Sequence, residues 1–522
     1  MVRKIHNNYK AIINTDSKKL PILYKSILIG LFVGIVTTLY RLVLMEAEEL
    51  SFRIYGYLRD NLIFIPIAFI VLGVTGFLIG SLVSKYSMIS GSGIPQVKGI
   101  IMGYFKNNWL GTLIVKFFGG TVSILAGLSL GREGPSIQLG ACAAEGLGNK
   151  LAASRTERKV LIASGAGAGL AAAFNAPLAG AMFAMEEIFK YFSPVILLST
   201  MVSAVIADFV SKMVFGNNPV FSFNMQNNIP LNDYWLLIIL GATLGVIGAF
   251  YNFILIQTQK LYKKSKWLNV KTRPIIPFML AGVLGLFFPL VLGGGHKIID
   301  ELQLTTGITF LLLIFVIKFM FSMISFGSGA PGGIFFPLLI LGATVGAIYG
   351  NIAVNYFGYD ANLFYNFVIL AMVGYFTAIV RAPITGIILL VEMTGSFTHL
   401  LSLTVVSIIA YIVADLLKSH PIYESLLETR ILEHEIEIEE HDHSKKITIE
   451  TIVHYGSSAE NKLVKEIDLP SRCLLIAIKR RRKEIIPKGD TKILAEDYLV
   501  CLTNVSDEAK IRETLADITT AS

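Results

Sequence analysis

The sequence has few charged residues and few cysteines, and it carries no motif for a metal or a catalytic nucleophile. Charged residues make up 16% of its 522 residues, against ~25% in an average soluble domain. Cys142, Cys473 and Cys501 have neither metal-site nor disulfide-framework spacing. The histidines are scattered, with His441 and His443 in a charged segment. Nothing in the sequence supports an enzyme, a metal site or a cofactor.

The low content of charged residues goes with long apolar stretches. Hydrophobic residues make up 54% of the chain, and the mean hydropathy is +0.64. Residues 26–45, 61–83 and 233–256 are each long enough to cross a bilayer. We count about ten such stretches, some of them merged or short. The composition therefore predicts a polytopic helical membrane protein.

Basic residues gather at the N-terminus, where only Asp16 opposes them. These basic residues are Arg3, Lys4, Lys10, Lys18, Lys19 and Lys25. By the positive-inside rule this end is cytoplasmic, and the basic loops 150–159 and 260–266 favour the same side. The first apolar stretch is too long for a signal peptide and lacks a cleavage pattern, so we expect a retained helix. The net charge of +8 then reflects topology and anionic lipid, and it predicts no nucleic-acid partner.

The composition changes abruptly after the last apolar stretch and predicts four regions. They are a cytoplasmic tail (1–19), a membrane domain (20–428), a charged linker (429–446) and a soluble domain (447–522). In the soluble domain, CLLIAIKR, KEIIP and YLVCLTN are typical of strands, and residues 507–518 of a closing amphipathic helix. We expect this domain to be small and α+β.

The membrane domain contains an internal repeat. NAPLAGAMFAMEE (175–187) matches RAPITGIILLVEM (381–393), which places Glu186 opposite Glu392. GREGPSIQLGA (131–141) matches GIFFPLLILGA (333–343) at nearly the same offset. Two related halves are therefore expected, at approximately 20–215 and 233–418. Repeats in transporters are often inverted, with the substrate site where the halves meet. The likeness of GSGIP (91–95) to GSGAP (327–331) breaks the offset, so we interpret it as shared turn chemistry.

Three Gly- and Pro-containing segments interrupt the apolar sequence: GSGIP (91–95), GREGP (131–135) and GGIFFP (332–337). Each has the pattern of a helix start. A helix start leaves unpaired N–H groups and the positive end of the dipole, which together attract an anion. Irregular backbone at membrane depth is tolerated only around a protein-lined or watery cavity. Converging helix starts would bind a weakly hydrated anion without a fixed cation.

With PIY (421–423), these segments stand in the order found in the chloride channel and transporter (CLC) family, which the chain resembles over residues 20–428. The resemblance implies an all-α membrane fold of two inverted repeats of tilted and broken helices. It also implies a homodimer with one pore per subunit. The motif residues that carry it are Gly91, Gly93, Pro95, Gly131, Arg132, Gly134, Pro135, Gly332, Gly333 and Pro337.

The resemblance also implies a chloride site. Its ligands would be the hydroxyls of Ser92 and Tyr423 and the backbone amides of Ile334 and Phe335. The side chains of Ile334 and Phe335 are expected only to pack. Substituting them should therefore affect the protein less than substituting Gly332 or Gly333. Two alternatives stay open, in which Ser92 is a helix cap and Tyr423 an interfacial aromatic anchor.

The family's gating glutamate corresponds to Glu133 and its inner proton-transfer glutamate to Glu187. An ionised Glu133 would occupy the anion's place, whereas a protonated one could swing away. The alternative is a first-turn glutamate that only stabilises the helix dipole. Arg132 is expected to brace the structure, and Glu186 to be structural because Glu392 is its repeat partner. Glu187 favours a proton-coupled exchanger over a channel.

Residues 465–504 resemble the C-terminal regulatory domain of prokaryotic potassium-uptake proteins (TrkA-C type), through strand-like runs around "IIPKGDT" and "EDYL". Such domains usually dimerise, and some bind small regulatory ligands. KRRRK (479–483) is interpreted as a solvated hairpin turn, with a phosphate site as the alternative.

The sequence as a whole predicts voltage- or pH-sensitive chloride transport in the plasma membrane, by H⁺/Cl⁻ antiport, with both termini cytoplasmic. Chloride and H⁺ would be the substrate ions, with membrane lipid around the protein. A passive chloride channel is the alternative within the family. A ligand-sensing membrane protein, regulated through its C-terminal domain, is the alternative from another class.

Overall fold

The computed structural model describes residues 19–190, 192–221, 223, 229–265, 268–438, 446–470, 472–480, 483–504 and 507–520. The chain forms two compact units. The helical unit is Met1–Lys98 with Asn107–Leu427, and the sheet unit is Gly99–Lys106 with Glu428–Ser522. The predicted tail up to residue 18, the linker histidines and part of KRRRK lie outside the described residues.

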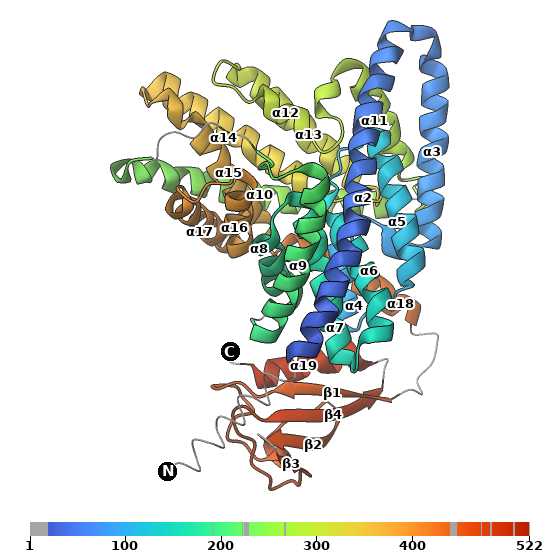
Figure 1. The fold of residues 1–522 in the computed structure, drawn as a ribbon, viewed down its shortest axis with the longest axis vertical. Coiled ribbons are helices and arrows are strands. Elements are labelled where there is room, and N and C mark those ends of the chain that lie inside the picture. The colour runs from blue at the N-terminus through green and yellow to red at the C-terminus, as the bar shows by residue number, and fades with distance from the viewer. Residues whose placement is uncertain are drawn as a thin grey trace. The chain divides into compact units, whose positions relative to one another are not determined.

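Two series of helices follow one another along the chain (Figure 1). The first series is α2 (Lys19–Asp60), α3 (Ile65–Lys85), α4 (Ile94–Met102), α5 (Trp109–Leu125), α6 (Glu133–Leu151), α7 (Arg155–Phe174), α8 (Pro177–Phe183) with a π-helical turn η3 (Ala184–Phe189), and α9 (Pro194–Phe215). The second is α10 (Tyr234–Lys264), α11 (Ile275–Phe287), α12 (His296–Glu301), α13 (Ile308–Gly327), α14 (Phe335–Phe357), α15 (Phe364–Val380), α16 (Pro383–Thr394) and α17 (Leu400–Leu416). Helix α18 (Ile422–Ile438) follows.

Glu186 and Glu392 show that the two series are related by a pseudo-two-fold axis. Glu186 accepts hydrogen bonds from the amides of Ile384 (3.1 Å) and Thr385 (2.7 Å) at the start of α16. Glu392 accepts from the amides of Leu178 (3.0 Å) and Ala179 (2.8 Å) at the start of α8. Each glutamate thus caps the helix N-terminus of the other half, where unpaired amides favour a carboxylate. The structural role predicted for Glu186 is confirmed.

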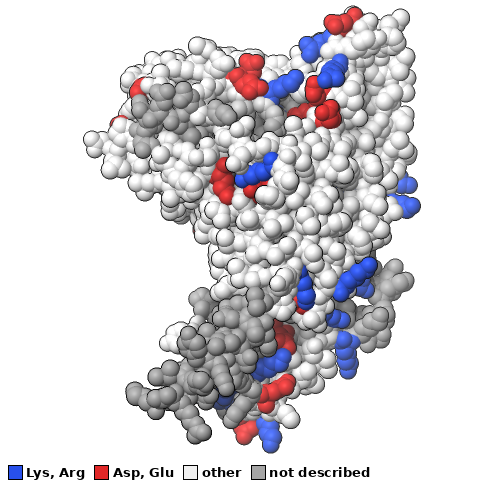
Figure 2. Space-filling model, in the orientation of Figure 1, with Lys and Arg blue, Asp and Glu red and all other residues white. Residues whose placement is uncertain are grey.

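Apolar side chains cover much of the helical unit. Seven of the described helices are long and apolar enough to cross a membrane, and shorter apolar helices lie between them. Large apolar side chains are exposed on these helices, such as Ile70 on α3 and Phe118 on α5. On the face drawn in Figure 2, white atoms form wide areas with few charged groups. Such a surface suits lipid, and the protein is a multi-pass membrane protein.

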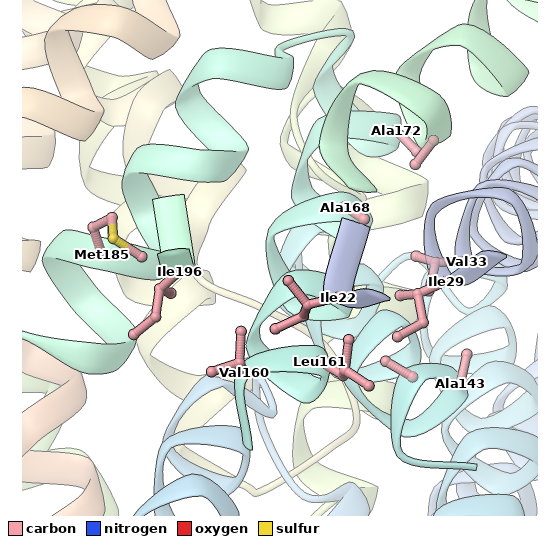
Figure 3. Packing of buried hydrophobic residues seen from close by; sticks show 12 residues of the cluster. Ile22, Ile29, Val33, Ala143, Val160, Leu161, Ala168, Ala172, Met185 and Ile196 are labelled. Atoms are coloured by element: carbon pink, nitrogen blue, oxygen red, sulfur yellow. The ribbon is translucent and has the colours of Figure 1, made fainter. Parts of the chain in front are cut away.

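Small residues allow close helix packing in the core of the first half. Ile29 and Val33 of α2 pack with residues of α6, α7 and α9 in one buried cluster (Figure 3). Gly140 of α6 and Gly165 of α7 face one another so closely that a Cβ on Gly140 would overlap the carbonyl oxygen of Gly165. Membrane helices associate through such small-residue contacts, because lipid offers no hydrophobic drive between them.

The sheet unit contains a four-stranded antiparallel sheet in the order β1-β4-β2-β3. Its elements are β1 (Lys446–Ile452), β2 (Leu474–Arg480), β3 (Lys483–Ile485), β4 (Tyr498–Asn504) and α19 (Glu508–Thr519). The three predicted strands and the closing helix are present, but β1 was not predicted. The buried Asp497 accepts hydrogen bonds from Nε and Nη2 of Arg480, at 2.8 and 2.7 Å. These bonds raise the pKa of the Arg480 guanidinium.

The predicted linker 429–446 begins as helix, because α18 continues to Ile438, and its role as a linker stays a prediction. The segment around LEHEIEI alternates glutamate with aliphatic residues, and glutamate is a good helix former. A helix already begun at Ile422 therefore extends into the charged run. The remainder of the linker lies almost wholly outside the described residues.

Replacement of Glu392 tests the reciprocal caps. Glu392→Ala leaves the amides of Leu178 and Ala179 without their acceptor, so we expect the free energy of unfolding to fall by about 1–2 kcal/mol. Glu392→Gln keeps one acceptor oxygen and should lose less. Thermal unfolding of the detergent-purified protein measures the difference. An alanine variant as stable as the wild type would contradict the capping role.

Candidate ion-binding site

The three predicted helix starts meet at a short antiparallel bridge in the helical unit. Gly131 and Gly333 exchange two backbone hydrogen bonds, of 2.7 and 2.8 Å. The amide of Gly332 donates to the carbonyl of Gly91 at 3.0 Å. A Cβ on Gly134 would lie 2.9 Å from the Cβ of Ser92. The segments GSGIP, GREGP and GGIFFP are therefore in direct contact, although they are far apart in sequence.

The turn before α4 depends on two glycines. Gly91 and Gly93 have φ values of +63° and +91°, where side chains are disfavoured. A Cβ on Gly93 would also overlap Oε1 of Gln138. Between them Ser92 is buried, and its hydroxyl accepts a hydrogen bond from the amide of Ile94 at 3.3 Å. Ser92 thus makes the helix-cap contact that was the alternative to an anion ligand. Its hydroxyl accepts that hydrogen bond, so its own proton can still be donated to another group.

Two buried lysines hold equivalent turns in the two halves. Lys116 of α5 donates to the carbonyls of Ile89 (2.8 Å) and Gly91 (2.5 Å). Lys318 of α13 donates to the carbonyls of Val291 (2.9 Å) and Gly293 (2.7 Å). GSGIP therefore has GGGHK (293–297) as its structural counterpart, and the interpretation of GSGAP as shared turn chemistry fits this arrangement.

The start of α14 presents backbone amides, and its side chains pack. Ile334 and Phe335 are buried, and the ring of Phe335 lies 5.3 Å from that of Phe174 and 4.8 Å from that of Phe376. The first amides of a helix have no acceptor within that helix. The role of the Ile334 and Phe335 amides as anion ligands, which the family resemblance implies, stays a prediction.

Glu133 is a buried carboxylate without a hydrogen-bond partner among the described residues. It is the first residue of α6. A Cβ on Gly131 would lie 2.5 Å from Oε2 of Glu133 and 3.2 Å from the amide nitrogen of Phe336, so both groups face the same small space. Nε of Arg132 is 3.8 Å from Oε1 of Glu133, a loose ion pair. The carboxylate therefore lies by the start of α14, in the opposite half.

A small cavity lies beside Glu133 and is lined also by Arg132, Glu48 and His296. Its volume is about 10 Å³, room for about one water molecule. His296 stacks on Phe336 with ring centroids 4.1 Å apart, and its Nδ1 is 3.4 Å from Oε2 of Glu48. Glu133 thus has a polar space into which a neutral side chain could turn.

Tyr423 stands in the first turn of α18 and is wholly buried. Its hydroxyl has no hydrogen-bond partner among the described residues. Glu187 and Glu133 are the carboxylates that act on it electrostatically. A buried, unsatisfied hydroxyl is costly unless a ligand or water completes it. This burial argues against the alternative of an interfacial anchor.

Glu187 lies in the π-helical turn η3 and is fully buried. Nζ of Lys98 is 3.2 Å from Oε1 of Glu187, and Nζ of Lys190 is 3.4 Å from Oε2. Glu424 pairs with both lysines, at 3.5 and 3.0 Å. Lys190 and Glu424 are about one-third exposed, at 33% and 35%, whereas Lys98 is 2% exposed. The four residues form a charge cluster that runs from Glu187 to the surface of the unit.

Sequence reasoning missed the lysines and Glu424. A signal for Lys116 and Lys318 exists, because VKF (115–117) and IKF (317–319) recur at the same offset as the bridge glycines. Lys98 and Glu424 follow Ser92 and Tyr423 closely in sequence, but nothing in their spacing indicates Glu187 as a partner. Among the described residues no group of three or more His, Cys, Asp or Glu could hold a metal ion.

Gly93→Ala tests how far the serine turn depends on glycine. The variant forces a Cβ into Gln138 at a positive φ, and we expect a loss of about 3 kcal/mol in the free energy of unfolding. Gly358 also has a positive φ, +73°, in the left-handed helical region, but nothing lies within 4 Å of the place that a Cβ would take. Gly358→Ala therefore carries only backbone strain of about 1–2 kcal/mol. If thermal unfolding showed an equal loss of stability in the two variants, the close contact between position 93 and Gln138 would be contradicted.

Comparisons with known proteins agree with this geometry. Residues 75–415 match the family model described as voltage gated chloride channel, and residues 449–516 match the TrkA-C domain. The chain is 35% identical over 429 residues to the H⁺/Cl⁻ exchange transporter ClcA of Vibrio cholerae serotype O1, covering 80% of this chain and 91% of the relative. It is 31% identical over 441 residues to ClcA of Klebsiella pneumoniae, covering 82% and 93%.

A solved structure of a slow cyanobacterial Cl⁻/H⁺ antiporter has a TM-score of 0.75 at 30% identity, covering 79% of this chain and 98% of that one. The family model, the sequence relatives and the solved structure thus all match the helical unit. This chain belongs to the voltage gated chloride channel (CLC) family and carries a C-terminal TrkA-C domain.

Proposed function

We propose that this protein is a secondary transporter that exchanges chloride for protons across the membrane. The observation that carries the proposal is Glu133, a buried carboxylate that faces the amides of a second helix start and has no hydrogen-bond partner among the described residues. Relatives and a solved structure with chloride/proton exchange in their names support it.

Chloride would bind to the hydroxyls of Ser92 and Tyr423 and to the amides of Ile334 and Phe335. The two hydroxyls donate hydrogen bonds, and the amides add the positive end of the α14 dipole. No lysine or arginine is needed as a direct ligand, so the ion is held weakly enough to leave again. The hydroxyl of Tyr423, which has no hydrogen-bond partner among the described residues, would then donate to the bound chloride.

Glu133 would act as the gate. When ionised, its carboxylate competes with an anion for the amides at the start of α14. When protonated, it loses most of that attraction and can turn into the cavity that it lines. One side chain then ties the uptake of a proton to the passage of an anion. Glu187 would supply or receive the proton from the other direction, and Arg132 would brace the gate.

Family membership also supports an assembly and a location. The protein would be a homodimer with one pore per subunit, in the cell membrane, with both termini cytoplasmic. The TrkA-C domain would bind a small regulatory ligand. Chloride and H⁺ are substrate ions in this scheme, which requires no cofactor and no enzymatic step.

Ion flux from liposomes tests exchange against passive conduction. With the wild-type protein, a chloride gradient imposed at equal pH on both sides should drive net proton movement and so build up a pH difference across the membrane. Extravesicular pH and chloride electrodes measure the two fluxes together. Chloride flux without proton movement would identify a passive channel and refute exchange. Ligand binding to the protein with no ion flux at all would favour a sensor.

Glu133→Gln tests the gate. The amide cannot ionise, so we expect proton movement to disappear and chloride flux to persist without pH dependence. Glu157→Gln is the matched control, because Glu157 is a first-turn glutamate of α7 whose hydrogen bonds lie away from the bridge. Proton movement that stays coupled to chloride flux in Glu133→Gln would contradict the gate role. Glu133 would then be only a first-turn glutamate that stabilises the dipole of α6.

A further inference from the structure

The charge cluster of Lys98, Glu187, Lys190 and Glu424 carries an inference that rests on the proposed exchange. We propose that Lys98 is a positioning residue that controls the proton on Glu187 by alternating between two carboxylates, Glu187 and Glu424. Glu187 is buried completely, so its carboxylate depends on nearby cations to remain ionised. The group nearest to it is the almost equally buried ammonium of Lys98.

The geometry lets one ammonium serve either of two carboxylates. Nζ of Lys98 lies 3.2 Å from Glu187 and 3.5 Å from Glu424, so both carboxylates are within reach of one ammonium. Oε2 of Glu187 has no hydrogen-bond partner among the described residues and lies 3.4 Å from Nζ of Lys190, so this oxygen is the one that would take up the proton. When that proton arrives, Glu187 becomes neutral and Lys98 keeps its charge partner in Glu424.

The exposed members of the cluster give the proton a route. Lys190 and Glu424 reach solvent, and they pair with one another at 3.0 Å. Lys190 also lies three residues from Glu187 in sequence and 3.4 Å from its Oε2. The charged or titratable groups that face Glu187 are therefore Lys98 from α4, Lys190 beyond η3, and Tyr423 and Glu424 from α18.

The cluster also connects the proton to the candidate chloride site. Lys98 stands six residues after Ser92, on the helix whose start Ser92 caps, and Glu424 directly follows Tyr423. A change in the partner of Lys98 therefore acts on the two elements that carry the chloride hydroxyls. Protonation of Glu187 would therefore be coupled to anion binding at Ser92 and Tyr423 through Lys98 and Glu424.

Opposite shifts in pH dependence test this inference. Lys98→Met removes the cation from Glu187, so protonation becomes easier and the pH midpoint of coupled transport should move up by about one unit. Glu424→Gln removes a like charge and leaves Lys98 to Glu187 alone, so the midpoint should move down. The measurement is proton and chloride flux in liposomes, with pH varied equally on both sides.

Two controls accompany these variants. Lys98→Arg keeps the charge and should restore a midpoint near that of the wild type. Lys212→Met removes a lysine of similar exposure to Lys190 that pairs with Asp208 at 2.8 Å, and it should leave the midpoint unchanged.

The outcomes separate the inference from the proposed function. Coupled wild-type flux with unshifted variants, or with shifts of the same sign, overturns the role of Lys98. Uncoupled wild-type flux overturns the exchange itself. If Lys98→Met does not fold, Lys98→Gln takes its place, because it also removes the charge, and only an upward shift of the midpoint agrees with the proposal.

Discussion

The antiparallel bridge between Gly131 and Gly333 places the starts of α6 and α14 beside one another. A helix that begins inside a membrane protein leaves amides that neither water nor lipid can satisfy. The bridge pairs the amides of Gly131 and Gly333, just before the two helix starts, and brings the first amides of the helices to a shared space. Replacing either glycine with a larger residue would separate the helix starts, because a Cβ on Gly333 would already lie 3.1 Å from the amide nitrogen of Gly134.

The same constraint explains why four charged side chains in this fold serve backbone groups. The half-buried Glu186 and Glu392 accept hydrogen bonds from amides at two helix starts, and the buried Lys116 and Lys318 donate to carbonyls at two turns. Such charge-assisted bonds are stronger than neutral ones and offset the cost of burial. Each pair obeys the pseudo-two-fold axis, so a single structural solution occurs twice.

Sequence reasoning reached the helix starts, the repeat and the C-terminal domain because these depend on local composition and on order along the chain. Glycine and proline mark broken helices wherever they occur, and the offsets between matching segments need no coordinates. The cluster around Glu187 could not be predicted in this way, since α4, η3 and α18 come together only through tertiary packing. The extension of α18 was missed for a different reason, because charged residues at 429–446 resemble a solvated linker.

Symmetric positions that differ in chemistry locate the candidate site within this repeated scaffold. The counterparts of Ser92 and Glu133 are Gly294 and Phe335, and Met393 takes the place of Glu187. A second carboxylate at position 335 would put two like charges at one bridge, and at least one of them would then hold a proton permanently. A single gate therefore requires that one half keep only backbone amides. The repeat supplies the converging helix starts. Under the proposed exchange, the loss of symmetry at three positions would give the first half a hydroxyl for the anion and two carboxylates for the proton, while the second half would offer the anion its bare amides.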